Sequence, residues 1–231
     1  MILFGMILLS MLVTTTSCGA DETGSSSQGC GRAAPATAPV SIEVGGRTRE
    51  FISVVPESYD SDVPHRLIFA FHGRTTPNTR VRKYYRIDRE RVFAVGHSLG
   101  ASFANSLGCA RGAVIRGVGT VAGRIWDIKC SGPAAEMIMH NPNDDLVPVS
   151  RGLKARDWAL AQNGLKPPAR PCEPRDLNCE CYGPPGTPNP VVWCPHTQDL
   201  NRQGKFYPHL WPKEAGAAIM EFFDSLPASA Q

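Results

Sequence analysis

The chain has 231 residues, with 24 Lys and Arg against 21 Asp and Glu, and a formal net charge of +3. So small a charge for this length argues against a nucleic-acid-binding protein and indicates no acidic partner. With 42% hydrophobic residues, the chain is long enough to form one domain with a sizeable core.

The N-terminus reads as an export signal. An apolar run of about a dozen residues, Ile2 to Val13, is too short to span a bilayer and precedes the small polar stretch 14–18. We therefore predict a signal peptide at residues 1–18, although it contains no Lys or Arg. Simple cleavage is favoured over a lipoprotein signal, in which a lipid on Cys18 would be the only contact with a membrane. Residues 19–39, rich in Gly, Ser, Ala and Pro, are expected to form a flexible tether before a single domain at 40–231.

Eight cysteines are typical of an exported enzyme rather than a cytosolic one. If Cys18 is set aside, an odd number is left, which predicts at least one free thiol. A zinc site is the rival interpretation of four of them, but their C-x-C spacing lacks the paired C-x₂-C that zinc favours: Cys172, Cys179, Cys181 and Cys194.

The first predicted elements are a hairpin and a buried strand. Strands at Val40–Val44 and Arg49–Val55 flank a Gly45-Gly46 turn. The apolar run Arg66–Phe71 is typical of a strand in a parallel sheet, and it ends in His72-Gly73-Arg74. A glycine at such a strand end suits a loop whose backbone amide binds an oxyanion, so Gly73 is a candidate for that role.

The stretch Arg91–Leu107 predicts a strand, a sharp turn and a helix. The turn, Gly96-His97-Ser98-Leu99-Gly100, has the G-x-S-x-G pattern of a nucleophile elbow, in which glycines let strand and helix approach closely and the serine stands above the sheet. Ser98 is therefore the candidate nucleophile, and the amide of Leu99 is a second candidate oxyanion donor.

Further strands are predicted at Val114–Val121 and Ala135–Met139, and the second runs into a loop containing Asp144 and Asp145. A carboxylate just past a strand end is placed to orient a catalytic histidine. On physical grounds either aspartate could serve, and either could instead cap a helix beginning near Pro148.

The remaining chain predicts two helices and a final strand. The helices are Arg151–Asn163 and an amphipathic Pro212–Leu226, and between them come a disulfide-tied loop at Pro167–Pro190 and the strand Val191–Cys194.

Two of the six histidines, His196 and His209, follow the candidate acids in the last loop, as the chain order Ser, Asp, His requires. His209 is favoured because the closing helix would hold it, and His196 remains an alternative. Trp211 and Tyr207 lie near His209 and could form a flat wall for an aromatic acyl group or simply pack beneath the loop.

Taken together, these segments resemble the α/β-hydrolase esterases of the polyhydroxybutyrate depolymerase and feruloyl esterase group. The matching pieces are GCG (29–31), RLIFAFHG (66–73), DRERVFAVGHSLGASFANSL (88–107), MHNPNDDLVP (139–148), VVWC (191–194) and HLWPKEA (209–215). The resemblance implies an α/β-hydrolase fold, Asp144 as the acid and His209 as the histidine. It implies no metal or cofactor.

The resemblance has one serious departure. In the family a helix, a strand and a helix separate the oxyanion strand from the nucleophile strand, whereas here only Arg74–Glu90 intervene. We therefore expect a shortened fold that lacks one strand and its flanking helices after residue 74. Either the N-terminal hairpin pairs directly with the oxyanion strand, or that sheet edge stays open.

The sequence thus predicts a secreted or cell-envelope serine esterase that acts through an acyl-enzyme. The resemblance implies ferulate esters on polysaccharide or short polyhydroxyalkanoate chains as substrates. The alternative is a catalytically inactive remnant, or a binding module of the cell envelope.

Overall fold

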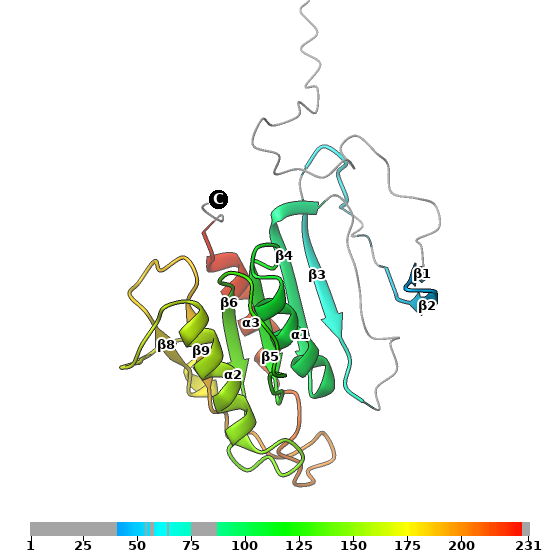
Figure 1. Cartoon of the computed structure of the whole chain (residues 1–231). Coiled ribbons are helices and arrows are strands. Elements are labelled where there is room, and N and C mark those ends of the chain that lie inside the picture. Colours follow the sequence, from blue (N-terminus) through cyan, green and yellow to red (C-terminus); the bar gives the residue numbers. More distant parts are fainter. Residues whose placement is uncertain (1–40, 54, 56–57, 64, 75–86, 228–231) are drawn as a thin grey trace, which may run out of the picture.

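The computed structural model describes residues 41–53, 55, 58–63, 65–74 and 87–227 (Figure 1). The predicted signal peptide and tether, Cys18 and Cys30 lie outside these ranges, as does most of the short connection Arg74–Glu90. None of the described helices is long and apolar enough to cross a membrane.

A seven-stranded sheet in the order β3-β4-β5-β6-β9-β8-β7 forms the centre of the molecule. Its first five strands are parallel: β3 (His65–Phe71), β4 (Ile87–His97), β5 (Gly117–Val121), β6 (Ala135–Met139) and β9 (Val191–Cys194). The last two, β8 (Glu180–Tyr182) and β7 (Arg170–Pro171), run antiparallel and cover the free edge of β9.

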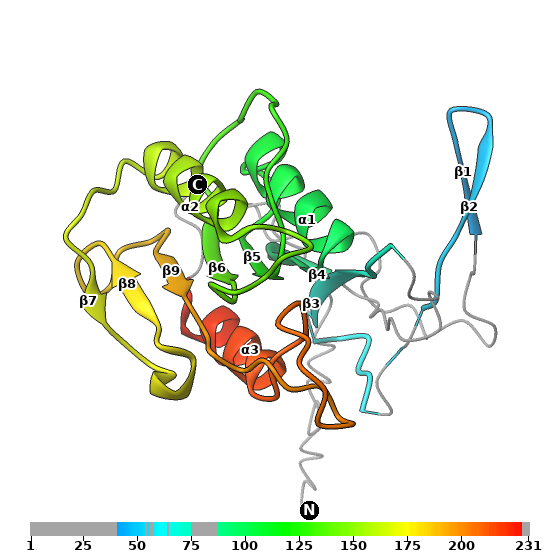
Figure 2. The same ribbon diagram turned by 90° about the horizontal axis from the view of Figure 1, so that it is seen from below.

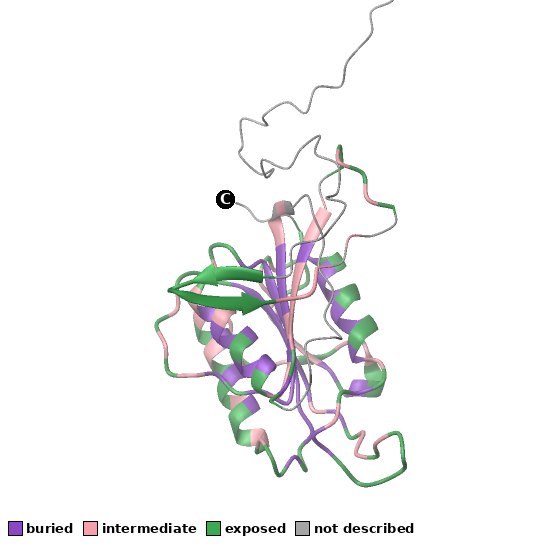
Figure 3. Cartoon of the chain, turned by 90° about the vertical axis from the view of Figure 1, so that its right-hand side faces the viewer, coloured by how far each residue is buried: buried purple, intermediate pink, exposed green. Residues whose placement is uncertain are grey.

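Helices cover both faces of this sheet (Figure 2). Helices α1 (Leu99–Ala110) and α2 (Val149–Gln162) lie on one face, and α3 (Ala215–Ser225) lies on the other. Because both faces are covered, every residue of β5 and β6 is buried, and Figure 3 shows the strands as a buried layer between exposed helix surfaces. The arrangement is the predicted α/β-hydrolase fold.

The core depends on close approach between α3 and the sheet. A Cβ at Gly119 of β5 would lie 2.5 Å from Cγ2 of Ile219, so only glycine lets the helix pack at this distance. Beside it, the rings of Phe93 and Phe223 stack with centroids 4.2 Å apart. The predicted apolar face of the helix is confirmed, since all of its members are buried: Ala215, Ala218, Ile219, Phe222 and Phe223.

Several predicted element ends were wrong. The second hairpin strand, β2, spans Arg47–Glu50 rather than Arg49–Val55, because Gly45 and Gly46 alone make the turn with φ of 59° and 70°. The strand predicted at Val114–Val121 begins at Gly117, since the amides of residues 114 and 115 bond back to the carbonyl of Arg111. Helices α2 and α3 begin at Val149 and Ala215 rather than at Arg151 and Pro212.

The N-terminal hairpin stands apart from the main sheet (Figure 2). Strand β1 (Ser41–Val44) pairs with β2 in a two-stranded sheet of its own, and all residues of both strands are exposed. In the part of the chain that the structure describes, β3 pairs with β4 alone. The predicted pairing of the hairpin with the oxyanion strand, which is β3, therefore does not occur.

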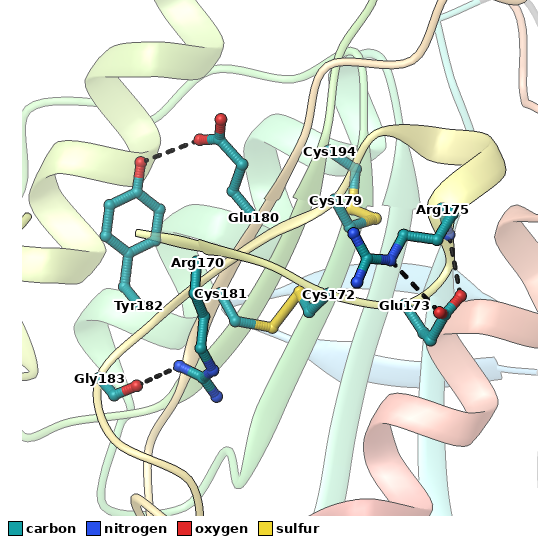
Figure 4. Close-up of a disulfide and its surroundings, with 10 residues drawn as sticks. All are labelled: Arg170, Cys172, Glu173, Arg175, Cys179, Glu180, Cys181, Tyr182, Gly183 and Cys194. Carbon is teal, nitrogen blue, oxygen red and sulfur yellow. Dashed lines mark hydrogen bonds and ion pairs between the residues drawn. A yellow bond between two sulfur atoms is a disulfide. The ribbon is translucent and has the colours of Figure 1, made fainter. Parts of the chain in front are cut away.

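Disulfides account for all six cysteines of the described residues. The pairs are Cys109–Cys130, Cys172–Cys181 and Cys179–Cys194. The zinc interpretation was therefore wrong, and the predicted free thiol is not found among these six. Figure 4 shows that Cys172–Cys181 lies within the predicted disulfide-tied loop, and that Cys179–Cys194 fastens this loop to β9.

Candidate active site

Ser98 occupies a strained turn between β4 and α1. Its φ of 57° and ψ of −118° are rare for a residue with a side chain, and its amide donates to the carbonyl of Val121 at 3.0 Å. The turn depends on its glycines: a Cβ at Gly96 would lie 2.3 Å from the carbonyl carbon of Gly100, and one at Gly100 would lie 2.1 Å from the carbonyl oxygen of Phe71. These contacts account for the spacing of the motif.

The structure brings Ser98, His209 and Asp144 together from three distant parts of the chain. Nδ1 of His209 lies 2.7 Å from Oδ2 of Asp144, and Nε2 lies 2.8 Å from Oγ of Ser98. A carboxylate oxygen can only accept, so Nδ1 carries the hydrogen and Nε2 presents its lone pair to the serine hydroxyl. In this tautomer the imidazole can take the proton of Ser98.

Asp144 is held as a carboxylate by several donors. Its Oδ1 accepts from the amides of Leu146 at 3.0 Å and Val147 at 2.9 Å. Burial alone would raise the pKa of Asp144, but the bond from His209, these amides and the neighbouring imidazoles together lower the pKa below its ordinary value. Its competitor Asp145 is exposed, so the structure places Asp144 beside the histidine.

His97 holds the backbone of His209. Its Nε2 lies 3.1 Å from the carbonyl oxygen of His209, and because a carbonyl can only accept, Nε2 is the donor. Burial, reinforced by repulsion from His209, lowers the pKa of His97 to about 4, so the ring is neutral at pH 7. This contact of His97 with the backbone of His209 was not predicted, although His97 lies inside the G-x-S-x-G motif.

A second connection joins the acid loop to the histidine loop. Nδ2 of Asn141 donates to the carbonyl of Gln198 at 2.9 Å, and Oε1 of Gln198 accepts from the amide of Lys213 at 3.0 Å. Sequence reasoning missed both residues. The two bonds join residues 57 and 15 positions apart, which no local pattern in the sequence reveals.

Two further histidines lie buried beneath Asp144. Nε2 of His140 donates to the carbonyl of Val147 at 2.7 Å and lies 3.5 Å from Oδ2 of Asp144. Burial lowers the pKa of both His140 and His196, in the second case to about 4. Asp144 and Ser98 both bond to His209, so the geometry favours His209 over His196 as the histidine of the site.

The two candidate oxyanion donors flank the serine. Gly73 is buried, and a Cβ there would lie 3.4 Å from Cβ of Ser98. Leu99 is the first residue of α1, where the amides of the first turn have no acceptor within the helix. Both residues line the same cavity as Ser98.

That cavity has a volume of about 560 Å³. Its apolar wall consists of Leu99, Leu146, Val147, Pro148 and Tyr207, and three arginines complete it. Trp211, proposed from the sequence as a substrate contact, does not line the cavity. Its ring stands edge-on to that of His97, with centroids 6.3 Å apart. Among the described residues, no three His, Cys, Asp or Glu side chains are grouped so as to hold a metal ion.

Comparison with known proteins finds feruloyl esterases among the sequences similar to this chain. No family model matches the chain. The chain is 24% identical to feruloyl esterase C of Emericella nidulans over 217 residues, covering 71% of this chain and 76% of that enzyme. It is 23% identical to feruloyl esterase D of Neurospora crassa, covering 61% of this chain and 69% of that enzyme.

The first of these alignments runs over 217 positions but covers only 71% of this chain, which has 231 residues. It therefore contains gaps on this chain's side. Among solved structures, the structure of YahD with malic acid matches 60% of this chain and 53% of that one, with 15% identity and a TM-score of 0.35. The similarity to feruloyl esterases supports a carboxylic ester hydrolase.

Proposed function

We propose that this protein is a serine carboxylic ester hydrolase that acts through an acyl-enzyme. The observation that carries the proposal is the continuous hydrogen-bonded path from Oγ of Ser98 through His209 to Asp144. A serine in a strained turn with a base in contact and a carboxylate behind that base is the arrangement that activates a hydroxyl group for acyl transfer.

The reaction begins when Oγ of Ser98 attacks the ester carbonyl carbon and its proton passes to Nε2 of His209. The tetrahedral oxyanion accepts hydrogen bonds from the amides of Leu99 and Gly73. Its collapse breaks the bond to the alcohol oxygen, which leaves with the proton from His209. Water then attacks the acyl-enzyme with His209 as base, the acid departs and Ser98 regains its proton. Asp144 holds the imidazole tautomer and stabilises the imidazolium.

The substrate is proposed from the relatives and from the cavity. The curated relatives are feruloyl esterases, and the apolar wall at Leu146 and Tyr207 suits an aromatic acyl group. Ferulate esters on polysaccharide are therefore the first candidate class, and short polyhydroxyalkanoate chains are the second. The disulfides and the predicted signal peptide support a secreted or cell-envelope enzyme.

We also propose that the scaffold is internally shortened. The alignment gaps support a missing segment, and Arg74–Glu90 is the connection too short for the family's helix, strand and helix. Strands β3 and β4 are parallel neighbours in the sheet, so a short crossover suffices to bring Gly73 to Ser98. This shortening is also the observation that favours the alternative function, an inactive remnant or binding module.

Fluorophosphonate labelling distinguishes the two functions. We expect a fluorophosphonate probe to label the folded protein and not the Ser98→Ala variant, with Ser225→Ala, an exposed serine at the end of α3 and outside the cavity, as a control that keeps the label. Folded wild-type protein without label, or equal labelling of the Ser98→Ala variant, would overturn the esterase proposal. Rates on methyl ferulate, a 3-hydroxybutyrate oligomer and 4-nitrophenyl butyrate then separate the substrate classes.

A further inference from the structure

The catalytic cavity carries an excess of positive charge. Arg74 follows β3, Arg124 follows β5 and Arg151 stands in the first turn of α2, so the three guanidinium groups come from three different elements. No Asp or Glu is among the described residues that line the cavity.

These arginines differ from others on the same molecule. Arg66, Arg156 and Arg175 each pair with an acidic side chain, at Asp224, Asp157 and Glu173. Within the described part of the chain, the three cavity arginines make no such ion pair. A guanidinium group stays protonated at any physiological pH, so the three arginines give the cavity a positive charge that favours an anionic ligand.

Helices hold the backbones of two of the arginines that line the cavity with Ser98. The amide of Arg124 donates to Oγ of Ser102 at 3.2 Å, and its carbonyl accepts from Nδ2 of Asn105 at 3.1 Å. Both partners belong to α1, the helix that begins directly after Ser98. Arg151 belongs to α2 and follows the apolar wall at 146–148. The helices thus fix the backbone of each arginine, while its exposed side chain can turn toward an anion in the cavity.

We propose that the cavity accepts esters carrying a free carboxylate in addition to the ester group that is cleaved, and that Arg124 and Arg151 bind this carboxylate. The planar guanidinium fork matches a carboxylate with two parallel hydrogen bonds. This inference rests on the proposed esterase function. The carboxylate could lie on the acyl side, as in a half-ester of a dicarboxylic acid, or on the alcohol side, as at the acid end of a hydroxy-acid oligomer.

Two pairs of substrates test the inference and separate these sources. The acyl-side pair is the mono-4-nitrophenyl ester of adipic acid and 4-nitrophenyl hexanoate. The alcohol-side pair is the linear dimer of 3-hydroxybutyrate and the same dimer with its acid end converted to a carboxamide. We expect kcat/KM to favour the charged member by about tenfold or more in one pair, and the preference to shrink as salt is added.

Charge-removing variants localise the effect. Arg124→Gln and Arg151→Gln should each lower kcat/KM for the charged ester about tenfold more than for the neutral one. The control Arg175→Gln removes the same charge outside the cavity and should leave the preference unchanged. Equal rates within both pairs, or an equal loss of preference in the control, would overturn the inference.

If the carboxylate inference fails in this way but the fluorophosphonate still labels Ser98, the proposed esterase function is unaffected. If no ester is turned over, calorimetric binding of the adipate half-ester and of the hexanoate to the Ser98→Ala protein replaces the rates. Tighter binding of the half-ester that weakens in the Arg124→Gln background supports the inference, and equal binding overturns it.

Discussion

At the scale of single residues, the orientation of His209 is fixed from two directions. Asp144 holds Nδ1 of the ring, and His97 holds the backbone carbonyl of the same residue. The first bond selects the tautomer and the second fixes the loop, so the lone pair of Nε2 stays directed at the serine. The proposed catalysis therefore depends on the negative charge of the Asp144 side chain as well as on its position beside His209.

Substitution of Asp144 by Asn tests this dependence. An amide nitrogen in place of a carboxylate oxygen would favour the tautomer with hydrogen on Nε2, which cannot accept the serine proton. We expect kcat to fall by about three to four orders of magnitude with little change in KM. Asp145→Asn, one residue along and exposed, is the matched control and should keep wild-type kcat. Similar losses in both variants would contradict this assignment.

The regions that carry Ser98, Asp144 and His209 could be predicted because each follows a recognisable strand or precedes a recognisable helix. The choice of Asp144 over Asp145 rested on the family resemblance. The partner of His97 could not, because that bond spans 112 positions of sequence and depends on how the last loop folds back. The placement of Tyr207 rather than Trp211 in the cavity likewise depends on the path of that loop.

At the scale of secondary-structure elements, the contact between β3, β4 and α1 is the one that the site most depends on. Gly100 sits where the first turn of α1 crosses the end of β3, and a Cβ there would overlap the carbonyl oxygens of both Phe71 and His72. The helix therefore cannot keep its place above the sheet with any larger residue at this position.

We expect Gly100→Ala to lower the free energy of unfolding by at least about 2 kcal/mol and to abolish fluorophosphonate labelling. The control is Gly216→Ala in α3, where a Cβ meets nothing within 4 Å. Alanine there should stabilise the protein by about 0.5–1 kcal/mol, because glycine is the poorer helix former. Urea unfolding of the three proteins checks both signs, and an unaffected Gly100→Ala protein would refute the packing argument.

Most elements could be predicted from periodicity and turn residues, whereas their ends and their pairing could not. Strand β5 starts late because of backbone hydrogen bonds that carry no side-chain pattern. The antiparallel β7–β8–β9 arrangement brings Cys172 near Cys181 and Cys179 near Cys194, and strands this short could not be recognised in the sequence.

At the scale of the whole molecule, buried ionisable groups should make stability depend on pH. Burial lowers the pKa of His97 and of His196 to about 4 and lowers that of His140. Burial raises the pKa of Glu136, the second residue of β6, to about 8. None of these shifts can be seen in a sequence, since each follows from the packing around the side chain.

The buried histidines and Glu136 change the free energy of unfolding in opposite directions as pH rises. Below an unfolded pKa of about 6.5 the unfolded chain binds more protons at the histidines, so stability is lost as pH falls toward 4. Between about 4.5 and 8 the folded state alone keeps a proton on Glu136, so this group lowers stability as pH rises, with a slope of up to about 1.4 kcal/mol per pH unit. We expect maximum stability near pH 6.5.

Urea unfolding at pH 5, 6.5 and 8 measures this profile, and Glu136→Gln isolates one side of it. The variant should lose much of the decline between pH 6.5 and 8 while keeping the decline below 6.5. A wild-type profile that is flat over this range would contradict the burial of these charges, and an unchanged alkaline decline in Glu136→Gln would assign it to another group.

The left-handed backbone of Ser98 has a consequence for how such a chain persists. Residues with side chains in this region cost the folded state about 1–3 kcal/mol, whereas glycine adopts it freely. A polypeptide kept only as a scaffold would gain robustness by exchanging this serine for glycine. A serine at this position is what the proposed acyl-transfer function predicts, and it favours that function over the inactive-remnant alternative.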